Sequence, residues 1–155
     1  MKETPSNAKG GFTRKIRSIV VKYALNRLAH DLCLGVSTSK EAGDEILYGL
    51  PGIFTMEISA ADESVRIIKE ANTLRTMKTS EASDVLLRIK LEDIALLGDI
   101  VGRECTLQKA FAEGRMTFIG ETKHLATILR AGAAGDKAIL PNEEYFELYG
   151  KKKED

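Results

Sequence analysis

Histidine and cysteine, the side chains most often used for nucleophilic and metal chemistry, are sparse in this sequence. The two histidines, His30 and His124, lie far apart, and neither belongs to an HxxxH or HExxH motif. The two cysteines, Cys33 and Cys105, form no CxxC pair, which argues against a zinc site, a redox motif and a disulfide framework. We therefore predict no catalytic residue, no metal site and no cofactor, and we expect each histidine to serve in packing or at the surface.

Loops that bind phosphate or nucleotides are also missing from the sequence. It contains no GxSxG elbow, no Walker loop and no GxGxxG. Residues 49–52 (GLPG) have the GxxG spacing of a nucleic-acid clamp, but the loop holds no basic residue and precedes a strand-like segment, so it predicts a turn. With 23 basic and 23 acidic side chains the formal charge is zero, and we expect no nucleic-acid partner.

Positive charge is concentrated in the N-terminal part of the chain. Between Lys9 and His30 the sequence holds basic residues and neither Asp nor Glu. A basic amphipathic helix docks on an anionic membrane or an acidic protein, or it packs on the core and leaves a solvated basic face. Both interpretations stay open. The residues that would make a peripheral contact are Arg14, Lys15, Arg17, Lys22 and Arg27.

Hydrophobic spacing predicts a long amphipathic helix from Thr13 to about Leu34, with Gly35 as a stop. Its apolar residues fall on two adjacent rows, which are Ile16, Ile19, Val20, Tyr23 and Ala24, and Val21, Leu25, Leu28 and Leu32.

Alternation of apolar and polar residues predicts strands farther along the chain. The predicted strands span 52–59, 65–70, 73–79, 85–90 and 115–120, short helices span 91–99 and 106–113, and a final helix runs from Thr122 to a break at Gly132 and Gly135. Because the strands run in sequence instead of alternating regularly with helices, the fold class is α+β, with an antiparallel sheet and helices on one face.

The length fits one domain. A chain of 155 residues buries enough surface to fold without disulfides or a structural metal, and no repeat or long linker divides it. We expect a flexible N-terminal tail at 1–12, a single domain at 13–150 and a charged C-terminal tail at 151–155. No apolar run approaches the ~20 residues needed to span a bilayer, and no signal peptide is evident, so we expect a cytoplasmic protein.

The segment from Asp84 to about Arg130 resembles the sterol carrier protein 2 family. The resemblance is carried by an Asp-led strand, a short helix (LEDIALLGDIVG), a helix end of the "AF…G" type (TLQKAFAEG), a short strand ending in glycine (RMTFIG) and an apolar helix (HLATILRA). These motifs are short, but they occur in the family's order and spacing. The resemblance implies a five-stranded sheet with helices on one face and an apolar tunnel between them.

The resemblance further implies non-catalytic binding or transfer of a fatty acyl chain, a sterol-like molecule or an isoprenoid lipid. The alternative is an interaction or accessory subunit that supports a lipid- or quinone-pathway enzyme, or that docks on a membrane through the basic first helix. The expected wall of the cavity consists of Phe54, Met56, Leu87, Ile89, Ile94, Leu97, Phe111, Met116, Phe118, Leu125, Ile128 and Leu129.

Overall fold

The computed structural model describes residues 3–37, 40–77 and 84–150 of the chain. Its elements, in chain order, are α1 (Glu3–Ser37), α2 (Lys40–Tyr48), β1 (Thr55–Ala60), β2 (Glu63–Glu70), β3 (Thr73–Thr76), β4 (Leu87–Leu91), α3 (Ile94–Val101), α4 (Leu107–Ala112), β5 (Met116–Gly120), α5 (Thr122–Ile139) and α6 (Asn142–Tyr149).

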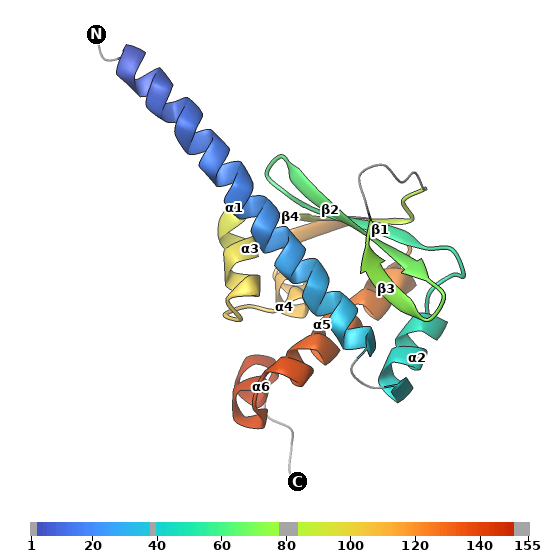
Figure 1. Ribbon diagram of the computed structural model, residues 1–155. Coiled ribbons are helices and arrows are strands. Elements are labelled where there is room, and N and C mark those ends of the chain that lie inside the picture. Colours follow the sequence, from blue (N-terminus) through green and yellow to red (C-terminus); the bar gives the residue numbers. More distant parts are fainter. Residues whose placement is uncertain (1–2, 38–39, 78–83, 151–155) are drawn as a thin grey trace.

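The five strands form one mixed sheet in the order β3-β2-β1-β4-β5. Three neighbouring pairs are antiparallel, and β1 and β4 run parallel at the centre of the sheet. The chain reaches β4 only after it has formed the β2–β3 hairpin on the other side of β1, which supplies the long connection that a parallel pair needs. The predicted α+β fold, with five mainly antiparallel strands and helices packed on the sheet, is confirmed (Figure 1).

One face of the sheet is apolar and the other is charged. In β4 the buried residues Leu87, Ile89 and Leu91 alternate with the exposed Arg88 and Lys90. Successive strand residues point to opposite faces, so this alternation directs one set of side chains to the helices and the other to solvent.

Glu57 of β1 joins three strands on the charged face. Arg88 of β4 donates Nη1 to Glu57 Oε1 at 2.6 Å, and Arg66 of β2 donates Nε to Glu57 Oε2 at 3.2 Å. The two arginine side chains are 47% and 39% exposed, so each ion pair adds little to stability. Their effect is to pair opposite charges across neighbouring strands, which favours the observed register.

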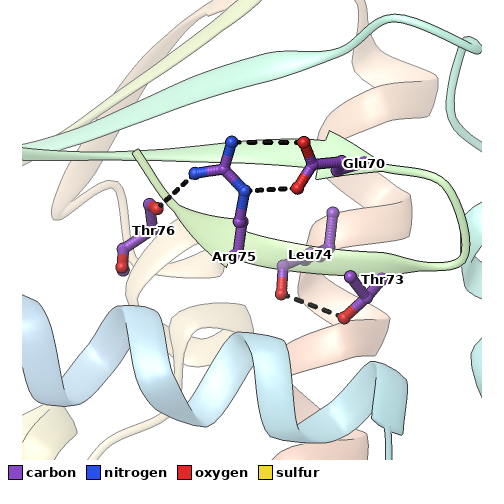
Figure 2. A network of polar contacts seen from close by, with 5 residues as sticks. All are labelled: Glu70, Thr73, Leu74, Arg75 and Thr76. Atoms are coloured by element: carbon purple, nitrogen blue, oxygen red, sulfur yellow. Dashed lines mark hydrogen bonds and ion pairs between the residues drawn. The ribbon is translucent and has the colours of Figure 1, made fainter. Parts of the chain in front are cut away.

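The β2–β3 hairpin is closed by a second set of polar contacts on the same face (Figure 2). Arg75 donates Nε and Nη2 to the two carboxylate oxygens of Glu70, and its Nη1 donates to the carbonyl oxygen of Thr76 at 3.2 Å. The turn holds Ala71 at a φ of 54°, a left-handed conformation that costs a residue with a Cβ roughly 1–2 kcal/mol. The bidentate pair therefore supports a turn that is intrinsically unfavourable.

α1 packs against α5 and the β2–β3 part of the sheet, and its N-terminal half projects beyond the rest of the molecule (Figure 1). The helix is longer than predicted at both ends, because it begins at Glu3 and continues through Gly35 to Ser37. Residues 3–12, predicted as a tail, are helical. Extending an existing helix costs far less than starting one, so a few poor helix formers such as Gly10 and Gly11 do not end it.

Two helices were not predicted, and a third is longer than predicted. α2 and α6 are short, and neither has a long enough apolar pattern to be distinguished from a loop. α5 runs to Ile139 and passes through Gly132 and Gly135, so the predicted break is wrong. Residues 77–79 lie partly outside the described chain, and the observed third strand ends at Thr76.

The glycines of α1 and α5 permit a close crossing of the two helices. A Cβ added at Gly35 would lie 2.1 Å from the carbonyl oxygen of Ala131, and one added at Gly135 would lie 2.2 Å from the carbonyl oxygen of Asp31. No side chain fits in such spaces, because the neighbouring atoms belong to the backbone of the other helix. These glycines therefore set the distance between α1 and α5 instead of ending either helix.

We predict that Gly135→Ala lowers the free energy of unfolding by about 1–3 kcal/mol, since overpacking a close contact has that cost. The matched control is Gly98→Ala in α3, where an added Cβ meets no atom within 4 Å and should raise stability by up to about 1 kcal/mol. Urea unfolding followed by circular dichroism measures both effects. Equal stability of the two variants would contradict the role of Gly135 in the crossing.

Candidate functional site

Most of the predicted wall residues lie together in the apolar interior between the sheet and the helices. Those that are buried in one core cluster are Phe54, Met56, Leu87, Ile89, Leu97, Met116, Leu125 and Ile128. Ile94, Phe118 and Leu129 are partly buried and pack against this cluster. Strands β1, β4 and β5 supply one side of the interior, and helices α3 and α5 supply the other.

Phe111 occupies a different position from the other predicted wall residues. It lies at the surface end of α4, 40% exposed, and its ring meets the ring of Phe118 edge-on at 5.9 Å. Phe118 in turn packs against the core cluster.

A groove of about 570 Å³ opens at one end of this interior. It lies between α1, the β1–β2 turn and the start of α3, and its apolar lining residues are Val21, Ala61 and Ile94. Val21 is 1% exposed and belongs to the core, and Ile94 packs against the core. The groove therefore meets the apolar interior at these two side chains.

Charged residues of both signs flank the groove. Lys15 and Arg17 of α1 line it and are exposed, and Asp62 and Glu63 line the opposite side. Glu63 is already engaged, because Ser18 donates a hydrogen bond to Glu63 Oε2 and Lys22 Nζ lies 3.9 Å from Glu63 Oε1. Within the described residues, no ion pair is found for Lys15 or Arg17.

α1 is apolar on two sides, and only one side is buried. The buried row contains Val21, Leu25, Leu28 and Leu32, whereas Ile16, Ile19, Val20 and Tyr23 of the other row are between 46% and 66% exposed. The predicted basic residues Lys15, Arg17, Lys22 and Arg27 are exposed around this second row, and the side chain of Arg14 lies outside the described part. We call Ile16, Ile19, Val20 and Tyr23 the exposed stripe. Over the described residues, no helix is both long and apolar enough to cross a membrane.

The structure also contains a buried charge cluster that the sequence pattern does not indicate. Arg103 Nη2 lies 3.1 Å from Asp31 Oδ2, and Arg103 Nε lies 3.4 Å from Asp136 Oδ1. All three side chains are at most 16% exposed. Tyr149 of α6 donates a hydrogen bond to Asp136 Oδ2. Arg103 adopts a left-handed φ of 61°, a conformation that persists only where surrounding contacts hold it.

The histidines and cysteines of the described chain lie in different environments. His30 is exposed, whereas His124 is buried with its ring edge-on to Phe54 at 5.6 Å, and His124 Nδ1 has no hydrogen-bond partner among the described residues. Cys33 and Cys105 are free thiols, and burial raises the pKa of Cys33 to about 11, so this thiol is protonated at neutral pH. Among the described residues, no group of His, Cys, Asp and Glu side chains could hold a metal ion.

The chain matches no protein-family model and no curated protein. Solved structures similar to it include sterol carrier protein 2 domains. Sterol carrier protein 2 like 2 from Aedes aegypti shares 13% identity and a TM-score of 0.47, over 70% of this chain and 96% of that one. The family to which the sequence motifs pointed is thus also found among the structural neighbours.

Two further solved structures are similar in the same way. A UbiJ-SCP2 ubiquinone synthesis protein shares 12% identity and a TM-score of 0.47, over 77% of this chain and 92% of that one. Sterol carrier protein 2 from Yarrowia lipolytica shares 13% identity and a TM-score of 0.40, over 83% of this chain and 93% of that one.

We predict that the contribution of Asp136 to folding stability falls as pH rises from 3.8 through the raised pKa of this carboxyl in the folded state. Burial raises the pKa of Asp136 above its ordinary value of 3.8, although the hydrogen bond from Tyr149 and the charge of Arg103 act in the opposite direction. Between 3.8 and the raised value, the folded state binds the proton more tightly than the unfolded state. The stability that this group contributes is therefore present below 3.8 and is lost as pH rises through its folded pKa.

The variant Asp136→Asn should remove this contribution. Urea unfolding at a series of pH values measures the unfolding free energy of the wild type minus that of Asp136→Asn. This difference should fall as pH rises from 3.8 through the folded-state pKa of Asp136. Asp62→Asn, at an exposed position in the β1–β2 turn, controls for removal of one carboxylate. A difference that does not vary with pH would contradict the role of Asp136.

Proposed function

We propose that this chain binds an elongated apolar molecule reversibly and makes or breaks no bond in it. The observation that supports the proposal is the groove, because it is lined by Val21, which belongs to the apolar core, and by Ile94, which packs against the core. The resemblance of residues 84–130 to sterol carrier protein 2 motifs supports the same function.

The size of the groove suits such a ligand. Small-molecule sites in proteins usually enclose about 300–1,000 Å³, and the groove holds about 570 Å³. Each methylene group buried there contributes roughly 0.8 kcal/mol before entropy losses, so a long alkyl chain gains enough for useful affinity without polar chemistry. The predicted wall residues would accept the chain if it extends from Ile94 toward Leu97 and Met116, where flexible side chains can change conformation.

The cations beside the groove favour an amphiphile with an anionic head. Lys15 and Arg17 lie on the α1 side. Of the two carboxylates opposite them, Glu63 accepts a hydrogen bond from Ser18 and lies near Lys22, and Asp62 is exposed to solvent. A carboxylate or phosphate at the mouth of the groove would meet these cations, while the attached chain covers Val21 and Ile94. A long-chain fatty acid is the simplest molecule with this chemistry.

The test is displacement of a fluorescent long-chain fatty acid from purified protein. Ile94→Trp, which narrows the groove, and the charge reversal Lys15→Glu/Arg17→Glu should each weaken binding at least about tenfold, equivalent to 1.4 kcal/mol. The controls Ile119→Trp and Lys90→Glu lie on the charged face of the sheet, are exposed, and should leave affinity unchanged.

Native mass spectrometry of gently purified protein supplies an independent measurement. Co-purifying lipid would support the proposal. A protein that emerges without lipid and also fails to bind the fluorescent fatty acid would contradict it, and would favour the accessory-subunit alternative.

A second candidate function, peripheral docking on an anionic membrane, is favoured by the exposed stripe. The stripe places four large apolar side chains among the basic residues of α1, in the same stretch of the helix as the groove-lining residues Ser18 and Val21. Amphipathic helices with this arrangement lie in the membrane interface, with apolar side chains inserted and cations at the headgroups. Docking at this surface would also bring the groove next to the lipid from which a ligand is taken.

We predict that Ile19→Asp/Val20→Asp strongly reduces co-sedimentation with phosphatidylglycerol vesicles at low salt. Charge reversal at Arg14, Lys15 and Arg17 should have a similar effect, whereas Ile53→Asp, at another exposed isoleucine, should not. Binding that is unchanged in both α1 variants, or equal on neutral phosphatidylcholine vesicles, would rule out this docking mode.

A further inference from the structure

A second, smaller cavity lies under α6, away from the groove. It has a volume of about 20 Å³ and lies between α1, α3, α4, α5 and α6. Most of its lining is apolar, and the exceptions are Asp31, Asp136, Gln108 and Tyr149. A site of this volume holds a single group about the size of one water molecule, which needs roughly 10–15 Å³.

Two atoms of the charge cluster beside this cavity are buried without a hydrogen-bond partner, the acceptor Asp31 Oδ1 and the donor Arg103 Nε, and of these two residues Asp31 lines the cavity. Asp31 Oδ2 is paired with Arg103, and the two oxygens of Asp136 are paired with Arg103 and Tyr149. Asp31 Oδ1 is buried without a hydrogen-bond partner, on a residue that is only 6% exposed. A buried carboxylate oxygen without a donor is costly, so the site favours a group that donates a hydrogen bond to it.

The charge of the cluster also selects for a donor. Two carboxylates, Asp31 and Asp136, face the single guanidinium of Arg103. An anionic head would add a third negative charge, whereas a hydroxyl or an ammonium group would donate to Asp31 Oδ1 and an ammonium would also balance the charge.

We propose that the cavity under α6 binds the terminal hydroxyl or ammonium group of an apolar molecule, with Asp31 Oδ1 as its acceptor. The apolar chain of the ligand leaves between Gln108 of α4 and Tyr149 of α6, where the lining side chains are exposed or half-buried. α6 can shift to admit it, because none of its side chains is buried and its described polar tie to the body is the Tyr149–Asp136 hydrogen bond. This site would thus bind a hydroxyl or ammonium group, whereas the groove favours an anionic head.

Gly132 provides a variant that narrows the cavity and that we expect to fold normally. It lines the cavity, and an added Cβ would lie 3.5 Å from Leu107 Cδ1 and from Leu32 Cδ2, which are ordinary contacts. Gly132→Ala therefore fills part of a very small space, and alanine is a better helix former than glycine. Gly98→Ala, in α3 and outside the cavity, is the matched control.

The experiment is an NMR titration of the full chain with octylammonium chloride, 1-octanol and octanoate. We expect octylammonium and octanol, but not octanoate, to produce saturable shifts in the amide signals of Asp31, Gly132 and Ala133. Gly132→Ala should weaken this binding at least tenfold, and Gly98→Ala should not. Asp31→Asn should weaken octylammonium binding more than octanol binding, because it removes charge and keeps an acceptor.

Three results would overturn the proposal. They are octanoate binding at the same amides as octylammonium, equal affinity in Gly132→Ala and Gly98→Ala, and the absence of saturable shifts with any probe, which would leave the cavity as a water-sized packing defect. Fatty-acid binding at the groove would instead shift the amide signals of Ser18, Asp62 and Ile94. The absence of those shifts would contradict the groove proposal alone, so the two proposals are tested separately.

Discussion

The close crossing of α1 and α5 is the contact on which the rest of the structure depends. Gly35 and Gly135 let the two backbones approach to distances that no side chain permits. That approach presses Leu28 and Leu32 of α1 into the apolar interior and brings Asp31 near Asp136. Two carboxylates that close would repel each other, and Arg103 offsets the repulsion from a backbone conformation that residues with a Cβ rarely adopt. The helix crossing and the charge cluster are thus one arrangement.

The position of α1 also explains why this helix contributes residues to the core, to the groove and to the cavity under α6. Its C-terminal half is buried between α5 and the sheet, whereas its N-terminal half extends past the sheet and keeps apolar side chains in contact with solvent (Figure 1). The groove forms where these halves meet, beside the β1–β2 turn. Its cations suit an anionic head, and the carboxylates under α6 suit a donor. Both proposed sites thus include residues of the same helix, α1.

The elements that follow a strong local pattern could be predicted. Leu87, Ile89 and Leu91 alternate with Arg88 and Lys90, and that alternation gives both the strand and the face that is buried. No local pattern predicts the charge cluster, because Asp31 and Arg103 are 72 positions apart and each has the sequence surroundings of an ordinary surface residue. The two apolar rows of α1 were visible, but nothing local distinguishes Ile19, which is exposed, from Leu25, which is buried.

By itself, the sequence determined the fold class, the apolar character of the interior and the basic character of α1, because these follow from periodicity and composition. Tertiary structure alone decided which row of α1 is buried, what Gly132 and Gly135 do inside α5, and which polar atoms meet under α6. The physical reason is that burial and charge pairing depend on what other segments bring to a residue. Gly135 is a helix stop in isolation and a contact surface once Asp31 lies against it.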